Sequence, residues 1–229
     1  MIAIVDYGVG NLRSVERALL HVGAEPLITS DPGQLERASG IVLPGVGAFA
    51  PAKKKLSEGG LGREVVGLAR NGKPVLGVCL GYQLLFEESE EGGRHEGLGL
   101  LPGRVVAVEG SEHVPVIGWC RVRQIASSPI WSGIPDGAYF YFVHSYYPVV
   151  AGTSSQGSTV GGLPEDRGAP VPRMSPGTVH VAWCEYGIEF AAAIERGLIY
   201  ATQFHPEKSQ RWGLRLLENF AAIVKGGAR

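Results

Sequence analysis

Short apolar runs alternate with segments of helical periodicity over the first 80 residues of the chain. From Leu12, apolar residues recur at Val15, Leu19 and Val22, and this helical stripe stops at Gly23. Short apolar runs bounded by turn residues predict four strands, at "IAIV", "PLIT", "GIVLPG" and "PVLGV". Strands that alternate with helices in this way favour an α/β fold with a mainly parallel sheet flanked by helices.

The pattern changes after about Leu98. Valine-rich and aromatic-rich stretches are separated there by Gly and Pro, which predicts additional antiparallel strands at "RVVAV", "VIGWCRV", "YFYFVHSYY", "TVHVAW" and "LIYATQF". A final helix is expected after Ser209, which can cap it, and Gly226 and Gly227 should end it. Its buried stripe is predicted to consist of Trp212, Leu216, Phe220, Ile223 and Val224.

The segment from Ala151 to Gly177 is dense in Gly, Ser, Thr and Pro and almost free of large apolar residues. Because it cannot bury enough surface to offset its ordering entropy, we expect a long surface loop. The 229 residues suit one well-buried domain. We therefore predict a single domain over residues 1–229, with a loop insertion at about 151–177.

Charge and cysteine content exclude several classes of function. A net charge of -1 argues against nucleic-acid binding or a polybasic membrane role. Asp6 interrupts the first apolar stretch, which indicates no signal peptide, and no apolar run approaches the roughly 20 residues of a membrane span. Three widely spaced cysteines make a disulfide framework or a zinc site unexpected. We expect a cytoplasmic protein.

One cysteine lies between two glycines, directly after an apolar run, in "GVCLGYQ". Gly77 and Gly81 around Cys79 match the glycine–x–nucleophile–x–glycine form of a nucleophile elbow, in which a strand turns sharply into a helix. A helix over "LGYQLLFEES" would favour the thiolate through its dipole, and the Leu80 N–H would become an oxyanion donor. The alternative is a buried structural cysteine in a glycine-spaced turn.

A cysteine nucleophile needs a base, and His205 is the best placed of the six histidines. In "ATQFHPEKS" it follows an apolar strand, Pro206 stiffens the turn, and Glu207 comes two residues later. Residues two apart in extended backbone project to the same side, so the carboxylate can orient the imidazole. Cys79, His205 and Glu207 would then form an acyl-transfer triad that needs neither metal nor cofactor.

A second oxyanion donor is expected from the glycine-rich loop in "LPGVGAF" after the third strand. Gly45, Val46 and Gly47 can present backbone N–H groups unhindered by large side chains, and one such donor typically contributes about 10²–10³ in rate. An ordinary strand-to-helix turn is the alternative for this loop.

Two motifs, "GVCLGYQLLFEES" and "QFHPEKS", resemble those of class I glutamine amidotransferases. Within that family, other stretches are similar to the glutaminase subunits of imidazole glycerol phosphate synthase; these are "IAIVDYGVGNLRSV", "LPGVGAF", "GLGLLPGRV", "YFVHSYY" and "GLRLLENF". The resemblance covers nearly the whole chain outside Ala151–Gly177. It implies hydrolysis of glutamine to glutamate and ammonia by the triad, with the Val46 amide reorienting before it donates.

The resemblance also implies further site residues and a partner. Glutamine would be held by Gln83, Glu91, Ser145 and Tyr146. The partner would be a (β/α)8-barrel cyclase subunit that forms a heterodimer with this chain and uses the ammonia. Residues at or near that interface would be Asn11, Arg13, Trp119, Tyr141 and Lys208. Without the resemblance, Gln83 and Glu91 suit solvent-facing positions, and Trp119 and Tyr141 suit the core.

The chain departs from the family pattern at three places. Cys120 in "VIGWC" occupies a position where the family typically has Asn, which bears on a local interface contact. The insertion at 151–177 and the stretch "TVHVAWCEYGIEFAAAIERG" are both longer than expected. Three alternatives remain: a subunit of another synthase, such as that of anthranilate or pyridoxal phosphate; a stand-alone cysteine hydrolase; and a non-catalytic interaction module.

Overall fold

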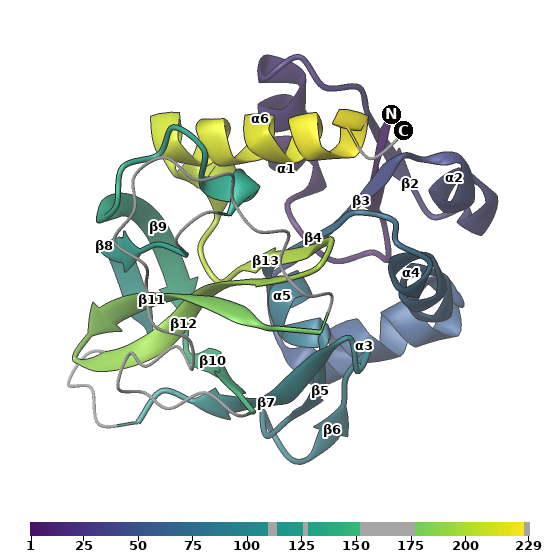
Figure 1. Cartoon of the computed structure of the whole chain (residues 1–229). Coiled ribbons are helices and arrows are strands. Elements are labelled where there is room, and N and C mark those ends of the chain that lie inside the picture. Colours follow the sequence, from purple (N-terminus) through teal and green to yellow (C-terminus); the bar gives the residue numbers. More distant parts are fainter. Residues whose placement is uncertain (110–113, 126–127, 152–176, 227–229) are drawn as a thin grey trace.

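A nine-stranded sheet runs through the part of the chain that the computed structural model describes, which comprises residues 1–109, 114–125, 128–151 and 177–226 (Figure 1). Five neighbouring strands are parallel, in the order β2 (Pro26–Thr29), β1 (Ile2–Val5), β3 (Gly40–Gly45), β4 (Val75–Cys79) and β13 (Ile199–Thr202). Antiparallel strands continue the sheet as β12 (Ile188–Arg196), β11 (His180–Tyr186), β8 (Val116–Arg123) and β9 (Ala138–His144). The predicted fold class is therefore confirmed.

A second sheet of four strands lies beside the first, in the order β10 (Tyr146–Val150), β7 (Leu101–Ala107), β5 (Phe86–Ser89) and β6 (His95–Glu96). The expected helix over "LGYQLLFEES" is wrong in its second half, because α5 ends at Leu84 and β5 begins at Phe86. Phe86 and Ser89 are fully buried, and β5 pairs in parallel with β7. This pairing with a later segment overrides the local helical composition.

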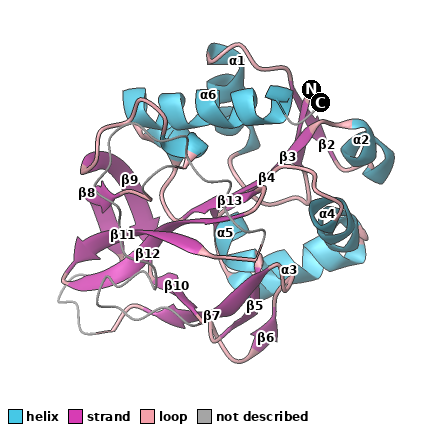
Figure 2. Cartoon of the chain, viewed as in Figure 1, coloured by secondary structure: helices cyan, strands magenta, loops and turns pink. Residues whose placement is uncertain are grey.

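Helices cover both faces of the large sheet (Figure 2). One face carries α1 (Leu12–His21), the 3-10 turn η1 (Pro129–Trp131) and α6 (Gln210–Gly226). The other face carries α2 (Pro32–Arg37), α3 (Phe49–Glu58), α4 (Leu61–Arg70) and α5 (Leu80–Leu84). Each face therefore has its own buried apolar cluster, as a parallel sheet requires.

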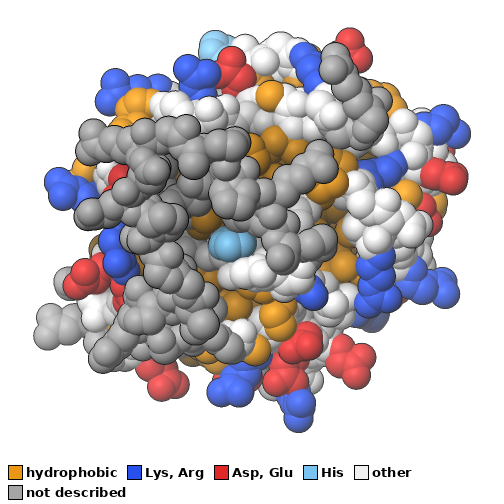
Figure 3. All heavy atoms as spheres, in the orientation of Figure 1, with side chains coloured by type: hydrophobic (Ala, Val, Ile, Leu, Met, Phe, Trp, Pro, Cys, Tyr) orange, Lys and Arg blue, Asp and Glu red, His pale blue; other side chains and the backbone are white. Residues whose placement is uncertain are grey.

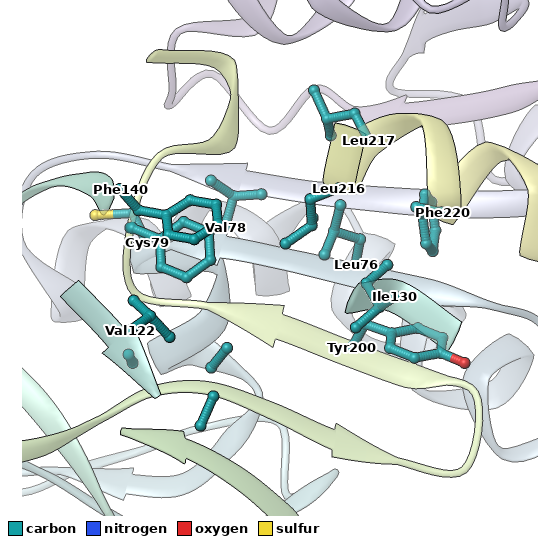
Figure 4. Close-up of a cluster of buried hydrophobic side chains, with 14 of the residues drawn as sticks. Leu76, Val78, Cys79, Val122, Ile130, Phe140, Tyr200, Leu216, Leu217 and Phe220 are labelled. Atoms are coloured by element: carbon teal, nitrogen blue, oxygen red, sulfur yellow. The ribbon is translucent and has the colours of Figure 1, made fainter. Parts of the chain in front are cut away.

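The cluster under α1 and α6 extends to the predicted nucleophile. In Figure 4, Leu216 and Phe220 of α6 face Leu76 and Val78 of β4, and all four side chains are buried. Full burial of one such side chain contributes roughly 2 kcal/mol. Cys79 lies at the edge of the same cluster with its sulfur pointing away from the α6 side chains. The apolar cluster thus packs against β4 up to its last residue.

The buried stripe predicted for the last helix, α6, is confirmed for most of its residues. Its buried side chains include Leu216, Phe220 and Val224, whereas Trp212 and Ile223 are only partly buried. Ser209 was expected to cap this helix, but its hydroxyl donates to the His205 carbonyl at 2.6 Å and accepts from the Tyr141 N–H at 2.9 Å. This serine therefore ties the turn after β13 to β9.

Apart from its ends at Ala151 and Gly177, the predicted insertion lies outside the described residues. Within the described ranges, none of the helices combines the length and apolarity needed to cross a bilayer. On the face shown in Figure 3, side chains of Lys and Arg alternate with those of Asp and Glu around the rim.

Candidate active site

Cys79 occupies a sharp turn between β4 and α5. Its φ of 53° and ψ of -111° are unusual for a residue with a side chain, and such strain is typical of a functional position. A Cβ on Gly77 would lie 2.8 Å from Leu85 Cδ1, and a Cβ on Gly81 would overlap the Leu43 carbonyl. The turn therefore requires both flanking glycines, and the strand–elbow–helix geometry predicted for "GVCLG" is present.

The helix that follows the elbow is shorter than expected. Since α5 spans only Leu80–Leu84, its aligned peptide dipoles amount to little more than one turn. The dipole of so short a helix has little effect on Cys79, contrary to the expectation from the sequence.

The glycine-rich loop after β3 lies beside the elbow, as predicted for a second oxyanion element. Gly45 is the register partner of Cys79 across β3 and β4. A Cβ on Gly45 would lie 2.6 Å from the Tyr7 hydroxyl oxygen and 2.9 Å from Leu80 Cβ, so only glycine fits. Beyond it, Val46 is 41% exposed and Gly47 has a φ of +92°. The loop thus leaves the sheet next to the thiol with little steric hindrance.

Tyr7 supports this loop and was not singled out by sequence analysis. Its hydroxyl donates to the Pro44 carbonyl at 2.7 Å and is buried. Burial, reinforced by the charge of Cys79, raises the pKa of Tyr7 far above its usual value, so the phenol stays protonated and remains a donor. The "DYG" turn after the first strand is the only local signal that could have pointed to it.

His205 and Glu207 are paired, as predicted. His205 Nδ1 lies 2.8 Å from Glu207 Oε1, and each side chain is only 2% exposed. The expected route was wrong, however, because Pro206–Lys208 form the 3-10 turn η2 instead of an extended segment. The tight turn brings the carboxylate back to the ring. The His205 N–H also donates to the Tyr141 carbonyl at 3.0 Å, which anchors the turn to β9.

The surroundings of His205 favour its protonated form. Burial lowers its pKa, but hydrogen bonding with Cys79 and Glu207 and the charges of both raise it, with a net pKa of about 9. Nε2 is buried and has no hydrogen bond of regular geometry within the described ranges. His205 is therefore an imidazolium beside the Cys79 sulfur at neutral pH.

Two buried amides connect the thiol to the segment after β9. Gln83 Nε2 donates to the Tyr146 carbonyl at 2.9 Å and to Gln203 Oε1 at 3.1 Å, and Gln203 Nε2 donates to Cys79 Sγ at 3.8 Å. Gln83 is 5% exposed and Gln203 is fully buried, so the solvent-facing alternative for Gln83 is wrong. Gln203 was not singled out as a site residue, although it lies in the quoted "QFHPEKS" motif.

His144 is a further buried group that sequence analysis missed. Its Nδ1 lies 3.0 Å from the Tyr146 carbonyl, the same acceptor that Gln83 uses. Burial lowers the pKa of His144 to about 4, and the positive charge of His205 adds to that effect. Because a carbonyl can only accept a hydrogen bond, Nδ1 carries the proton, and Nε2 is unprotonated with a free lone pair. The ring is neutral at physiological pH.

The other predicted glutamine-binding residues surround the same region. Glu91 Oε2 accepts a hydrogen bond of 2.8 Å from the Phe49 N–H, so it caps α3 directly after the predicted oxyanion loop. The Ser145 carbonyl accepts from the Val108 N–H at 2.8 Å, and Tyr146 pairs with Ala107 in the second sheet. The two sheets therefore meet at this site.

Three predicted interface residues lie together outside the triad. Trp119 is 44% exposed, so it does not belong to the core, and its ring centroid lies 6.1 Å from that of the half-buried Tyr141. Lys208 Nζ lies 6.0 Å from the Tyr141 ring centroid. Asn11 and Arg13 are exposed at the start of α1, which contacts η2. All five expected residues thus lie on neighbouring elements.

Cys120 does not share the exposed face of Trp119. It is 5% exposed, belongs to the apolar cluster under α6, and interacts there with Cys184 of β11. Side chains alternate between the faces of a strand, so Trp119 and Cys120 point in opposite directions. The departure from the family pattern in "VIGWC" therefore changes the core, and its side chain does not reach the exposed surface.

The family model described as "Glutamine amidotransferase class-I" matches residues 3–224. Two solved structures show the same fold. "Crystal structure of glutamine amidotransferase" has a TM-score of 0.65 at 20% identity, over 98% of this chain and 100% of the other. "Structure of PurLQS from Thermotoga maritima" has a TM-score of 0.66 at 17% identity, over 97% of each chain. The chain therefore belongs to the class I glutamine amidotransferase family.

Curated relatives match along almost their full lengths. "Imidazole glycerol phosphate synthase subunit HisH" of Desulfitobacterium hafniense is 44% identical, over 100% of this chain and 97% of its own. The protein of the same name from Moorella thermoacetica is 45% identical, over 98% and 95%. That from Methanosarcina mazei is 43% identical, over 97% and 98%. Within the family, these matches group the chain with the HisH subunits of imidazole glycerol phosphate synthase.

Proposed function

We propose that this chain is the glutaminase subunit of an imidazole glycerol phosphate synthase, which hydrolyses glutamine and delivers the ammonia to a cyclase subunit in histidine biosynthesis. The observation that carries the proposal is the convergence of three groups at the carboxyl ends of neighbouring strands. Cys79 ends β4, its register partner Gly45 ends β3, and His205 follows β13 with Glu207 bound to its ring. The full-length likeness to HisH subunits supports the choice of synthase.

The chemistry proceeds through a thioester. The Cys79 thiolate attacks the carboxamide carbon of glutamine, and the oxyanion is met by the Leu80 N–H and by the loop at Gly45, Val46 and Gly47. His205 gives its Nε2 proton to the nitrogen as the C–N bond breaks, and ammonia leaves. Neutral His205 then takes a proton from water, which attacks the thioester and releases glutamate and the thiolate. Glu207 stabilises the imidazolium in both halves.

Glutamine is held by the groups around the two buried amides. Both hydrogens of the Gln83 amide are used, on Tyr146 and Gln203, which leaves its Oε1 as an acceptor toward the substrate. Glu91 uses Oε2 on the Phe49 N–H and keeps Oε1 for the substrate ammonium. Backbone groups near Ser145 and Tyr146 complete the site on the side of the substrate carboxylate.

The partner is a (β/α)8-barrel cyclase that forms a heterodimer with this chain. It docks on the surface formed by Trp119, Tyr141, Lys208, Asn11 and Arg13. Tyr141 connects that surface to the triad, because its carbonyl accepts the His205 N–H. Ammonia released into water would be protonated and diluted, so a sealed transfer at this surface serves the reaction.

Residues 1–229 form one amidotransferase domain in this proposal. The support is that strands from both halves of the sequence share one sheet, since β13 pairs in parallel with β4. The segment at 151–177 is then an insertion in that domain.

Glutamate release from glutamine tests the function directly. The purified chain is assayed alone, with the cyclase subunit, and with both the cyclase and its nucleotide ligand. Low activity alone and a large rise in the full mixture, abolished by Cys79→Ala, are expected. Equal activity in all three mixtures would instead indicate a stand-alone hydrolase, and complex formation without activity would indicate a non-catalytic module.

A further inference from the structure

We propose that Gln203 is a positioning residue that holds a hydrogen-bond donor against the Cys79 sulfur and thereby favours the reactive thiolate. The proposal rests on the proposed function in one respect, which is that Cys79 is the nucleophile. It is carried by the bond of 3.8 Å from Gln203 Nε2 to Cys79 Sγ and by the contacts that orient the Gln203 amide.

A backbone carbonyl determines which end of the Gln203 amide faces the sulfur. The Tyr146 carbonyl can only accept, so the Gln83 atom 2.9 Å from it must be the NH2 group. That same NH2 group lies 3.1 Å from the Gln203 amide, which must therefore present its oxygen there. The remaining end of the Gln203 amide, its NH2 group, then faces Cys79. Reversing Gln203 would set two NH2 groups against each other.

Burial makes this donor effective. Gln203 is fully buried, Gln83 is 5% exposed and Cys79 is 7% exposed, so water does not compete for the bond. An N–H aimed at a charge in such surroundings stabilises the charged form more strongly than it would in water. The short helix α5 has only a small dipole, so individual hydrogen-bond donors contribute a larger share of any stabilisation of the Cys79 thiolate.

The backbone around Gln203 is held on both sides. Its N–H donates to the Ala192 carbonyl at 2.8 Å, and the Thr202 hydroxyl donates to the Phe204 carbonyl at 3.0 Å. Gln203 and His205 lie two residues apart on the segment that leaves β13, and both interact with Cys79. One anchored segment therefore brings a neutral donor and the general acid to the same sulfur.

The test measures alkylation of Cys79 by iodoacetamide as a function of pH, without glutamine and resolved by peptide mass spectrometry. Gln203→Met removes the donor. Gln203→Glu keeps an acceptor for Gln83 but places a carboxylate against the sulfur. We expect Gln203→Met to slow alkylation about tenfold at neutral pH, and Gln203→Glu to slow it further. Both should reach the wild-type rate at high pH, where the thiol is ionised in every variant.

Two further variants keep the test decisive. Gln34→Met makes the same chemical change on α2, away from the site, and should leave the pH profile unchanged. Gln83→Met releases the Gln203 amide to rotate and should slow neutral alkylation about threefold, a part of the full hydrogen-bond contribution. Circular dichroism shows whether the Gln203 variants fold. The Gln83→Met variant tests the proposal even if they do not.

A Gln203→Met profile that coincides with that of the wild type would overturn the proposal. So would a slowing that is equal at every pH, since that indicates altered access. If the Gln203 variants fold, their alkylation profiles decide whether the proposal holds. If none of them folds, an alkylation profile of Gln83→Met that equals that of the wild type overturns the proposal. Failure of the proposed function is distinguishable, because it would appear as glutaminase activity retained in Cys79→Ala or missing from the complex.

Discussion

Gly45 and Cys79 are register partners on the adjacent parallel strands β3 and β4. On the other side of β4, β13 leads to His205, whose imidazole is bound to Glu207. The residue proposed as nucleophile thus ends the middle strand of three, with the glycine-rich loop after β3 on one flank and the His205–Glu207 pair on the other. This is the usual position for ligands in open α/β sheets, outside the carboxyl ends of the strands.

The elbow is predicted to tolerate no side chain at Gly81. A Cβ there would overlap the Leu43 carbonyl, so Gly81→Ala should lower the free energy of unfolding by about 3 kcal/mol or more. Gly67→Ala is the matched control, because nothing lies within 4 Å of its added Cβ on α4, and it should raise stability by about 0.5–1 kcal/mol. Urea unfolding measures both. Equal effects of the two substitutions would show that the elbow is not tightly packed.

Glu207→Gln is predicted to change how stability depends on pH above neutrality. The pKa of His205 is about 9 in the folded state against a reference of 6.5, so the folded state keeps a proton that the unfolded state loses between these values. This contribution to stability is complete below pH 6.5 and is lost as the pH rises through 9, by at most about 1.4 kcal/mol per pH unit.

Removing the Glu207 charge lowers the pKa of His205, so the wild type should lose its stability advantage over Glu207→Gln between pH 6.5 and 9. Denaturant unfolding at several pH values measures the difference. Glu218→Gln is the control, because it breaks an exposed ion pair with Arg215. Stability curves of wild type and Glu207→Gln that stay parallel across this range would contradict the coupling.

His144 should act in the opposite direction. Its pKa of about 4 lies below the reference of 6.5, so the unfolded state binds a proton that the folded state does not. Stability is therefore predicted to fall as the pH drops from 6.5 to 4, and His144→Gln should make this loss less steep. The NMR signal of the His144 ring should titrate with a midpoint near 4. His21→Gln, at the exposed end of α1, is the control and should leave the loss of stability between pH 6.5 and 4 unchanged. A His144 ring that is already protonated at pH 6 in the folded protein would contradict the prediction.

Trp119→Ala is predicted to weaken the complex with the cyclase subunit without unfolding the chain. The side chain is 44% exposed and packs on Tyr141, so its loss should weaken binding about 30-fold, as for a typical aromatic anchor of an interface. Calorimetric titration measures the affinity. Leu198→Ala removes an exposed apolar side chain before β13, at the strand end away from Cys79, and should have no effect. Unchanged affinity in Trp119→Ala would remove this residue from the proposed interface.

Local patterns in the sequence determined the elements on which the site is built. The glycines around Cys79 predicted the elbow because their spacing about the cysteine is a local pattern, although the Leu43 carbonyl that excludes a side chain at Gly81 lies far away in the sequence. The His205–Glu207 pair was predicted for a similar reason, since two residues so close in sequence remain close in most backbone conformations. The strands followed from short apolar runs bounded by turn residues, and the buried stripe of α6 followed from the helical period of 3.6 residues.

Tertiary structure alone decided which distant residues surround the thiol. β5 became a strand because it pairs with β7, and this shortened α5 and weakened its dipole. Tyr7 and His144 reach the site because the order of strands brings their elements together, and no spacing in the sequence records that order. Gln203 lies two residues before His205, and the fold brings both of them to Cys79. Burial then determines the state of these side chains: it keeps Tyr7 protonated and His144 neutral, and it shields the Gln203 amide from water. The sequence specifies which side chain stands at each position, whereas the polarity of its surroundings depends on residues that only the folded chain brings together.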